Sequence, residues 1–118
     1  MTLVDTSVWV DHFRRHNPTL AGLLERGEVR CHPFVIGELA LGNLRRRQDT
    51  LALLAQLPVS CVVSHDEALE LVERHALSGR GIGWVDVHLL ASALVERVPL
   101  WTLDRRLAMV VRQLRAGG

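Results

Sequence analysis

The stretch MTLVDTSVWVD, residues 1–11, contains the signals that decide the fold. Leu3 and Val4 form a short apolar run of the kind that makes a buried strand. Thr6 and Ser7 follow with hydroxyl side chains that favour the start of a helix. Asp5 therefore lies where a strand ends and a helix begins, and in an open parallel sheet that edge binds ligands. The alternative is that Asp5 only caps the helix.

The composition indicates one globular domain, residues 1–118. Hydrophobic residues make up 48% of the chain and charged residues 23%, and a chain of 118 residues can bury a core without metals or disulfides. The net charge is only +1, so no overall basic field indicates a nucleic-acid partner. All fourteen basic residues are Arg. A general compositional bias explains this best, and we interpret the run Arg45-Arg46-Arg47 as a solvated surface with a possible share in RNA contact.

The cysteines and the hydropathy predict a cytoplasmic protein with no membrane partner. Cys31 and Cys61 lie far apart without a CxxC pair, so we expect two buried, reduced thiols. No signal peptide is expected, and no apolar run approaches the roughly 20 residues that span a membrane.

Strand and helix patterns alternate along the chain, which predicts an α/β fold with a doubly wound, mostly parallel sheet. Strands are predicted at residues 3–4, 29–32, 59–63 and 99–103. Helices are predicted from Thr6, over 19–26, from Pro33, over 47–57, from the Ser64 capping box, over 84–96 and over 105–114. The glycine-rich residues 79–83 follow a helix instead of a strand, so they do not match a dinucleotide-binding loop.

Four acidic residues stand out by their context. Asp5 and Asp104 follow predicted strands, whereas Glu38 and Asp86 lie inside apolar helical segments. Glu38 has no cation three or four residues away, so it either points to solvent or faces a shared site. If the strands before Asp5 and Asp104 are neighbours, both acids emerge at one edge of the sheet.

A cluster of four carboxylates points to a divalent cation. Such a cluster does not ionise fully without a cation, and hard oxygen ligands suit Mg²⁺ or Mn²⁺. One or two such ions activate water for attack on a phosphodiester. Thr6, Ser7 and Thr102 are placed to orient the carboxylates through their hydroxyls. Arg14, Arg15, Arg80 and Arg105 are candidates for guiding RNA phosphates.

Four motifs around these acids resemble those of PIN-domain ribonucleases, and most of all the VapC-type toxins of bacterial toxin–antitoxin pairs. They are LVDTSVW (residues 3–9), VIGELALG (35–42), GWVDVHLLASAL (83–94) and TLDRRL (102–107). The resemblance implies a three-layer α/β/α fold around a mostly parallel sheet of four or five strands. It also implies a Mg²⁺- or Mn²⁺-dependent endoribonuclease, a homodimer, and a cognate antitoxin that blocks the acidic pocket.

The resemblance carries over Asp5, Glu38, Asp86 and Asp104 as the catalytic, metal-binding residues. Two departures from the family pattern are visible. The chain leaves hardly any room for the usual final strand, and Leu107 stands where an aromatic residue is common.

Other functions fit the sequence less well. A phospho-receiver domain needs a Lys near its site, and the chain has none. A haloacid-type phosphatase needs a second Asp where Ser7 stands. His12 and His16 have a zinc-compatible spacing but no obvious third ligand. The remaining alternative is a PIN-fold module that binds RNA or protein without cleaving RNA.

Overall fold

The strand β1 (Thr2–Val4) is the central strand of a parallel sheet in the computed structural model, which describes residues 1–116. It pairs with β2 (Val29–Arg30) on one side and with β3 (Leu100–Trp101) on the other, giving the order β2-β1-β3. Leu3 and Val4 have 0% of their surface exposed. Their complete burial explains why so short an apolar run forms the central strand.

The helices connect these strands and continue to the end of the described residues. In chain order they are α1 (Thr6–Arg15), α2 (Pro18–Glu25), α3 (Pro33–Leu41), α4 (Arg47–Ala55), α5 (His65–Arg74), α6 (Trp84–Glu96) and α7 (Arg105–Ala116). Each predicted helix is present, and its predicted ends agree with the structure to within two residues, as expected for helix ends. Within residues 1–116, no helix is long and apolar enough to cross a membrane.

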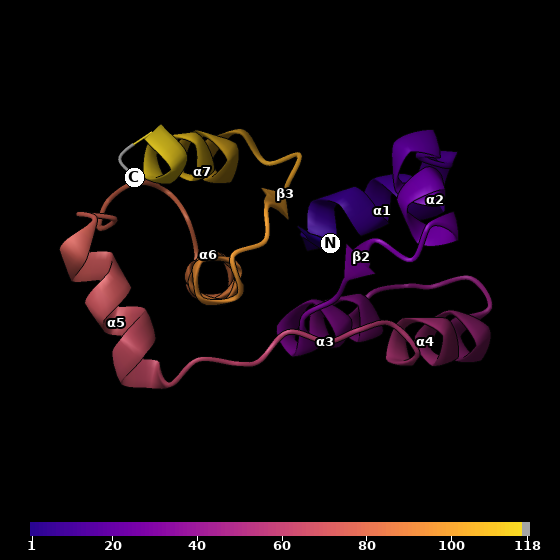
Figure 1. Ribbon diagram of the computed structural model, residues 1–118. Coiled ribbons are helices and arrows are strands. Elements are labelled where there is room, and N and C mark those ends of the chain that lie inside the picture. The colour runs from indigo at the N-terminus through magenta and orange to yellow at the C-terminus, as the bar shows by residue number, and fades with distance from the viewer. Residues whose placement is uncertain (117–118) are drawn as a thin grey trace.

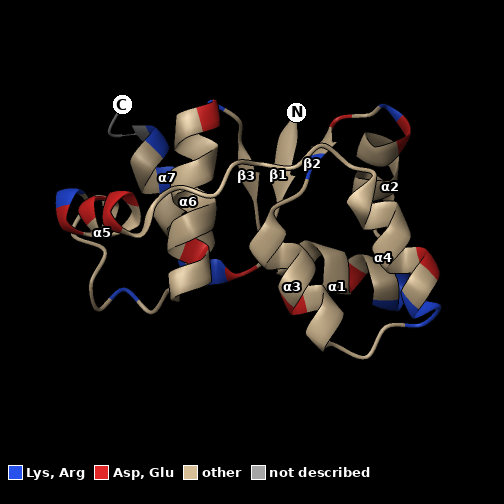
Figure 2. Ribbon diagram, turned by 90° about the horizontal axis from the view of Figure 1, so that it is seen from below, with Lys and Arg blue, Asp and Glu red and all other residues tan. Residues whose placement is uncertain are grey.

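The helices form two layers with the sheet between them. Figure 1 shows α1 to α4 on one side of the strands and α5 to α7 on the other, and Figure 2 shows the same division from below. The core fills both interfaces, with Trp9 and Leu20 from the first layer and Leu89 and Leu107 from the second completely or almost completely buried. The predicted three-layer α/β/α architecture is therefore confirmed.

The chain reverses its winding direction beside β1. From β1 it crosses to β2 on one side, and it later returns to β3 on the other side of β1. The helix after β1 and the helix after β3 enter opposite layers (Figure 1). The carboxyl ends of β1 and β3 therefore flank a topological switch point, the place where open α/β sheets bind ligands.

The predicted strand at residues 59–63 is wrong, and with it the count of four or five strands. Only Val59 makes a β-bridge, to Cys31 beside β2, and Val59 and Val62 are 43% and 44% exposed. The carbonyl group of Cys61 accepts a hydrogen bond from the Ser92 side chain. A β-branched run predicts a strand only where a neighbour offers backbone groups to pair with, and this segment crosses from one helical layer to the other instead. Residues 117–118, at the place of the usual final strand, lie outside the described residues.

Both cysteines are free thiols, as predicted, but the prediction of burial is correct for Cys31 and wrong for Cys61. Cys31 is completely buried beside β2, and burial raises the pKa of its thiol to about 11. Cys61 is exposed because it lies on the crossing segment.

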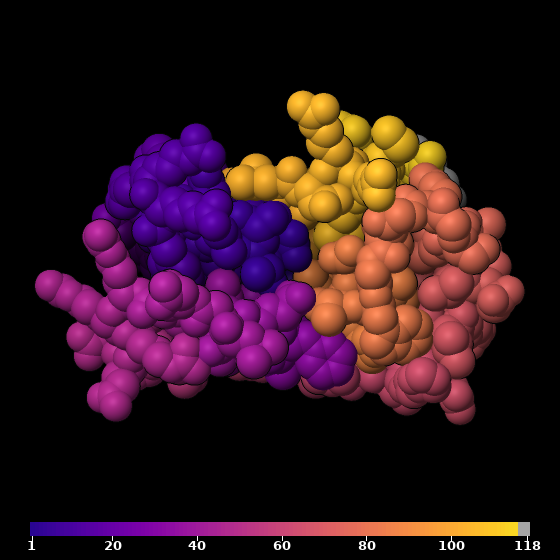
Figure 3. All heavy atoms as spheres, turned by 180° about the vertical axis from the view of Figure 1, so that it is seen from behind, coloured from indigo at the N-terminus to yellow at the C-terminus, as the bar shows by residue number. Residues whose placement is uncertain are grey.

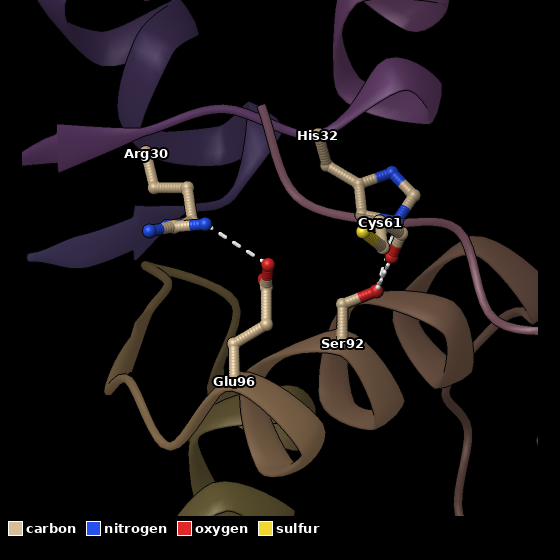
Figure 4. Close-up of polar contacts among 5 residues, drawn as sticks. All are labelled: Arg30, His32, Cys61, Ser92 and Glu96. Atoms are coloured by element: carbon tan, nitrogen blue, oxygen red, sulfur yellow. Dashed lines mark hydrogen bonds and ion pairs between the residues drawn. The ribbon is translucent and has the colours of Figure 1, made fainter. Parts of the chain in front are cut away.

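His32 holds α3, α6 and the crossing segment together (Figure 4). Its Nδ1 accepts a hydrogen bond from the backbone N–H of Phe34 at 3.0 Å, so the proton of the neutral ring is assigned to Nε2. Nε2 then donates to Ser92 Oγ at 3.2 Å, and Ser92 Oγ donates to the carbonyl of Cys61 at 2.8 Å. This relay fixes the start of α3 against the middle of α6.

A second contact fixes the far end of α6. Arg30 Nη1 on β2 donates to Glu96 Oε2 at 2.9 Å, and both side chains are largely buried (Figure 4). Removing one partner of such a pair leaves the other charge without compensation in a partly buried place. The two contacts together fix the position of α6 along the sheet.

The relay makes the stability of the fold depend on pH. Burial, and after it the neighbouring His88, lowers the pKa of His32 to about 4 from its ordinary 6.5. Between pH 6.5 and about pH 4, His32 is protonated in the unfolded chain but not in the folded chain. The free energy of unfolding therefore falls as the pH decreases through this range, by at most about 3 kcal/mol. We expect His32→Asn, which keeps an acceptor for Phe34 N–H but does not titrate, to show a shallower fall. Urea unfolding of both proteins across this pH range measures the free energy of unfolding against pH. The same pH dependence in both proteins would contradict this role of His32.

Candidate active site

Asp5 is the buried centre of the acidic site. Its residue is only 6% exposed, and it caps α1 from the end of β1. Its Oδ2 atom accepts hydrogen bonds from Ser7 Oγ at 2.6 Å, from Thr102 Oγ1 at 2.7 Å and more weakly from Ser7 N–H at 3.4 Å. Donors this close stabilise an ionised carboxylate. Because Oδ2 accepts all three hydrogen bonds, Asp5 can cap α1 and still offer its other oxygen for a functional role.

The same two hydroxyls extend the network to the segment that follows β3. Because Ser7 Oγ and Thr102 Oγ1 donate to Asp5, each uses its oxygen as an acceptor elsewhere. Ser7 Oγ accepts from Leu103 N–H at 2.9 Å, and Thr102 Oγ1 accepts from Asp104 N–H at 3.0 Å. The turn that positions Asp104 is thus built directly on the bonds that position Asp5.

Asp104 and Glu38 lie at the exposed margin of the site. Asp104 starts α7, where its Oδ1 accepts from Leu107 N–H at 3.0 Å. Glu38 on α3 accepts a hydrogen bond from Thr6 Oγ1 at 2.7 Å. Glu38 is exposed, and its carboxylate also contacts Thr6, the residue next to Asp5.

Asp86 lies in the first turn of α6, on the opposite layer. Its Oδ2 accepts from the N–H of Gly83, the residue that caps the helix, at 2.9 Å. Burial raises the pKa of Asp86, and the negative charges of Asp5, Asp104 and Glu38 raise it further. The three acids therefore lie near enough to Asp86 for their charges to act on it. Figure 2 shows red, acidic segments of α3, of α6 and of the link between β3 and α7 beyond the same end of the strands, although α3 and α6 belong to opposite layers.

The loop before Asp86 is shaped by close contact with α7. Gly81 has φ of +78°, and a Cβ atom there would lie 2.7 Å from Cδ of Arg106. The left-handed conformation favours glycine, and any side chain at this position would also require the Arg106 side chain to move. The contact fixes the loop that ends at Gly83 beside the turn that carries Asp104. Figure 3 shows the indigo N-terminal segment meeting the magenta and orange segments at the centre of one face.

The negative charge of the four acids is not neutralised by the protein itself. Within residues 1–116, the ion pairs of arginine residues involve Asp11, Glu28, Glu70 and Glu96, and none involves the four acids. Oxygen ligands with excess negative charge are the donor set that Mg²⁺ and Mn²⁺ prefer. The chemistry of the donor set therefore fits a divalent cation.

The carboxylates do not converge on one point as they stand. Among residues 1–116, no three His, Cys, Asp or Glu side chains are arranged to hold a metal ion. Three of the acids instead take local donors, from Thr6, Gly83 and Leu107. Repulsion between like charges favours such separation over convergence.

Comparison with known proteins shows the family of this chain. The PIN domain model matches residues 2–112, a range that includes all four acids. This chain belongs to the PIN domain family. Over 108 residues it is 54% identical to "Ribonuclease VapC32" from two strains of Mycobacterium tuberculosis, CDC 1551 / Oshkosh and ATCC 25618 / H37Rv. The similarity covers 91% of this chain and 87% of each relative.

Membership of the PIN domain family excludes the phospho-receiver and haloacid-type phosphatase readings. It confirms the family resemblance seen in the four motifs. Sequence reasoning did not identify the backbone N–H groups of Gly83 and Leu107 as partners of Asp86 and Asp104. The signal was present in both cases, because each acid stands at a helix start with the spacing of a capping interaction.

The hydroxyl of Thr102 is expected to contribute to the stability of this PIN domain. Thr102→Val removes the donor to Asp5 and the acceptor for Asp104 N–H, and we expect it to lower the free energy of unfolding by about 2 kcal/mol, as for hydrogen bonds to charged groups. Thr102→Ser keeps the hydroxyl and should cost much less. Urea unfolding measures both, and equal losses would show that the hydroxyl is not the important group.

Removing the charge of Asp86 is expected to stabilise the cation-free protein. Because the pKa of Asp86 is raised in the folded state, its ionisation opposes folding, and this penalty appears as the pH rises above the ordinary value of 3.8. Asp86→Asn keeps an acceptor for Gly83 N–H and abolishes the penalty. With EDTA present, the variant should therefore be more stable than the wild type at neutral pH and lose this advantage in acid. Glu70→Gln on the outer helix α5 is the matched control.

Proposed function

We propose that this protein is the toxin of a type II toxin–antitoxin system and acts as a divalent-metal-dependent endoribonuclease. The observation that carries the proposal is a group of four carboxylates at the switch point of the sheet that no cation of the described residues neutralises. A relative with 54% identity is named a ribonuclease, which supports RNA as the substrate. RNA hydrolysis needs a group that binds phosphate at an acidic surface, and a divalent cation meets that need.

We assign Asp5, Glu38, Asp86 and Asp104 as the residues that hold Mg²⁺ or Mn²⁺. When bound, the cation supplies a Lewis acid for the scissile phosphate and lowers the pKa of water. Asp5 has one oxygen, Oδ1, outside its hydrogen-bond network, because Oδ2 accepts all of the bonds from Ser7 and Thr102. That free oxygen is the one we assign as a ligand.

The hydroxyl residues position the ligands instead of contacting RNA. Ser7 and Thr102 hold the Asp5 carboxylate in one orientation, and Thr6 holds Glu38. Such fixed partners orient metal ligands and raise their affinity. Because the pKa of Asp86 is raised, a cation at this carboxylate would compete with a proton, and its affinity would increase as the pH rises.

The partners follow from the same assignment. The protein would act in the cytoplasm on RNA and be inhibited by a cognate antitoxin that covers the acidic site. We also propose a homodimer, which light scattering of the purified protein tests directly. A PIN module that binds without cleaving is the competing function, and activity measurements separate the two.

Purified protein, free of antitoxin, should cleave RNA with Mg²⁺ or Mn²⁺ and lose activity with EDTA. We expect Asp5→Asn and Asp86→Asn to reduce cleavage at least about 100-fold, because each removes a negative ligand while keeping the hydrogen bonds of the fold. Gel analysis of a structured RNA measures this, with Glu70→Gln as control. Normal cleavage by Asp5→Asn would disprove the site, and RNA binding by folded wild-type protein without any cleavage would favour the binding module.

A further inference from the structure

A cavity of about 570 Å³ opens beside the acidic site, between α1, α3 and the loop that leads into α4. Thr6 and Glu38 form part of its wall, and their side chains are joined by the 2.7 Å hydrogen bond described above. The cavity therefore begins where the acidic site ends. A polymer that places one phosphate at the acids has to leave across this cavity or in the opposite direction.

The walls of the cavity are apolar next to the acids. Val10, Leu39 and Leu44 line it, together with Phe13, whose residue is 39% exposed. Phe13 packs on Trp9, with ring centroids 6.0 Å apart, so the exposed ring is held in place from behind. A phosphate is not stabilised by such walls, whereas the flat face of a nucleobase is.

Two arginines complete the cavity beyond the apolar walls. Arg14 on α1 and Arg45 in the loop both line it and are exposed. Within residues 1–116 neither guanidinium has an ion pair or hydrogen bond, although exposed Arg15 and Arg74 each pair with a neighbouring acid. The loop itself is held by Thr50 Oγ1, which donates to the carbonyl of Arg45 at 3.2 Å. Two unpaired guanidinium groups on a fixed frame suit a phosphate.

We propose that this cavity is a nucleotide subsite that binds the unpaired nucleotide next to the scissile phosphate. The base lies against Phe13, and Arg14 and Arg45 bind the phosphate on its far side. The inference rests on the proposed ribonuclease function. Along α1 the lining residues run from Thr6 beside Glu38, through Val10, to Phe13 and Arg14, which matches the order phosphate, base, phosphate along one RNA strand. Because a stacked, paired base cannot enter such a cavity, the subsite selects single-stranded RNA.

Binding measurements separate the base contact from the phosphate contact. The probe is a fluorescent single-stranded RNA of about ten nucleotides, with Ca²⁺ present and over a range of salt concentrations. We expect Phe13→Leu to weaken binding about tenfold without changing the salt dependence, as for loss of one stacked base. We expect the double variant Arg14→Gln/Arg45→Gln to reduce the slope of log affinity against log salt concentration by about 0.7, the value for the one phosphate that both arginines bind.

Controls and a second RNA keep the interpretation specific. Arg74→Gln removes the same charge from an arginine on α5 and should leave the salt dependence unchanged beyond a small general effect. In a series of RNAs that lack one base each, one position should abolish the difference between Phe13→Leu and wild type. Thermal unfolding checks that the variants are folded, which their exposed positions favour.

The outcomes distinguish the subsite from the nuclease function. RNA cleavage that depends on Asp86, combined with variants that bind RNA like the wild type, would overturn the subsite and leave the function intact. Binding that depends on Phe13 and the two arginines, without cleavage, would support the subsite and disprove the nuclease. The subsite would be overturned if the wild type bound no RNA. It would also be overturned, in favour of a peptide groove, if the Phe13 and arginine variants bound the antitoxin more weakly but bound RNA like the wild type.

Discussion

The hydrogen bonds to the Asp5 carboxylate are the interaction on which the rest of the site depends. Ser7 and Thr102 come from opposite ends of the chain, and both donate to the same oxygen. Their own oxygens then accept the backbone N–H groups that shape the turn before α7. A buried carboxylate is costly unless it is well hydrogen-bonded. The need to satisfy Asp5 therefore brings the first and last motifs together and also places Asp104.

The other two acids depend on how the helical layers are held. Asp86 comes from α6, whose position is fixed by the relay from His32 through Ser92 and by the ion pair of Arg30 with Glu96. None of these contacts involves the four acids themselves. They stabilise a fold in which the charges of Asp5, Asp104 and Glu38 disfavour the ionisation of Asp86. The hydrogen bonds of His32 thus stabilise the position of α6, and the charge repulsion at Asp86 on the same helix opposes it.

The sequence was most informative where local chemistry determines the structure. Asp5 and Asp104 follow strands whose apolar runs are short but completely or largely buried, so their placement at the sheet edge could be predicted from position alone. The strand expected at residues 59–63 failed because β-branched residues indicate pairing only when a partner strand exists, which is a tertiary property. The burial of Asp86 and the exposure of Glu38 likewise depend on which layer each helix joins. The cavity beside Glu38 was not predictable, since it needs three segments that are adjacent only in the folded chain.

The distribution of charge explains how an almost neutral protein can be suited to a polyanion. The net charge is only +1, and a uniform surface of this kind attracts RNA weakly. Here the acids are concentrated at the switch point, while Arg14 and Arg45 stand unpaired within residues 1–116 at the adjoining cavity. Without a divalent cation the acidic site would repel the phosphate that the arginines attract. With the proposed cation at the acids, the two regions would act in the same direction, and cation binding would then control productive RNA binding.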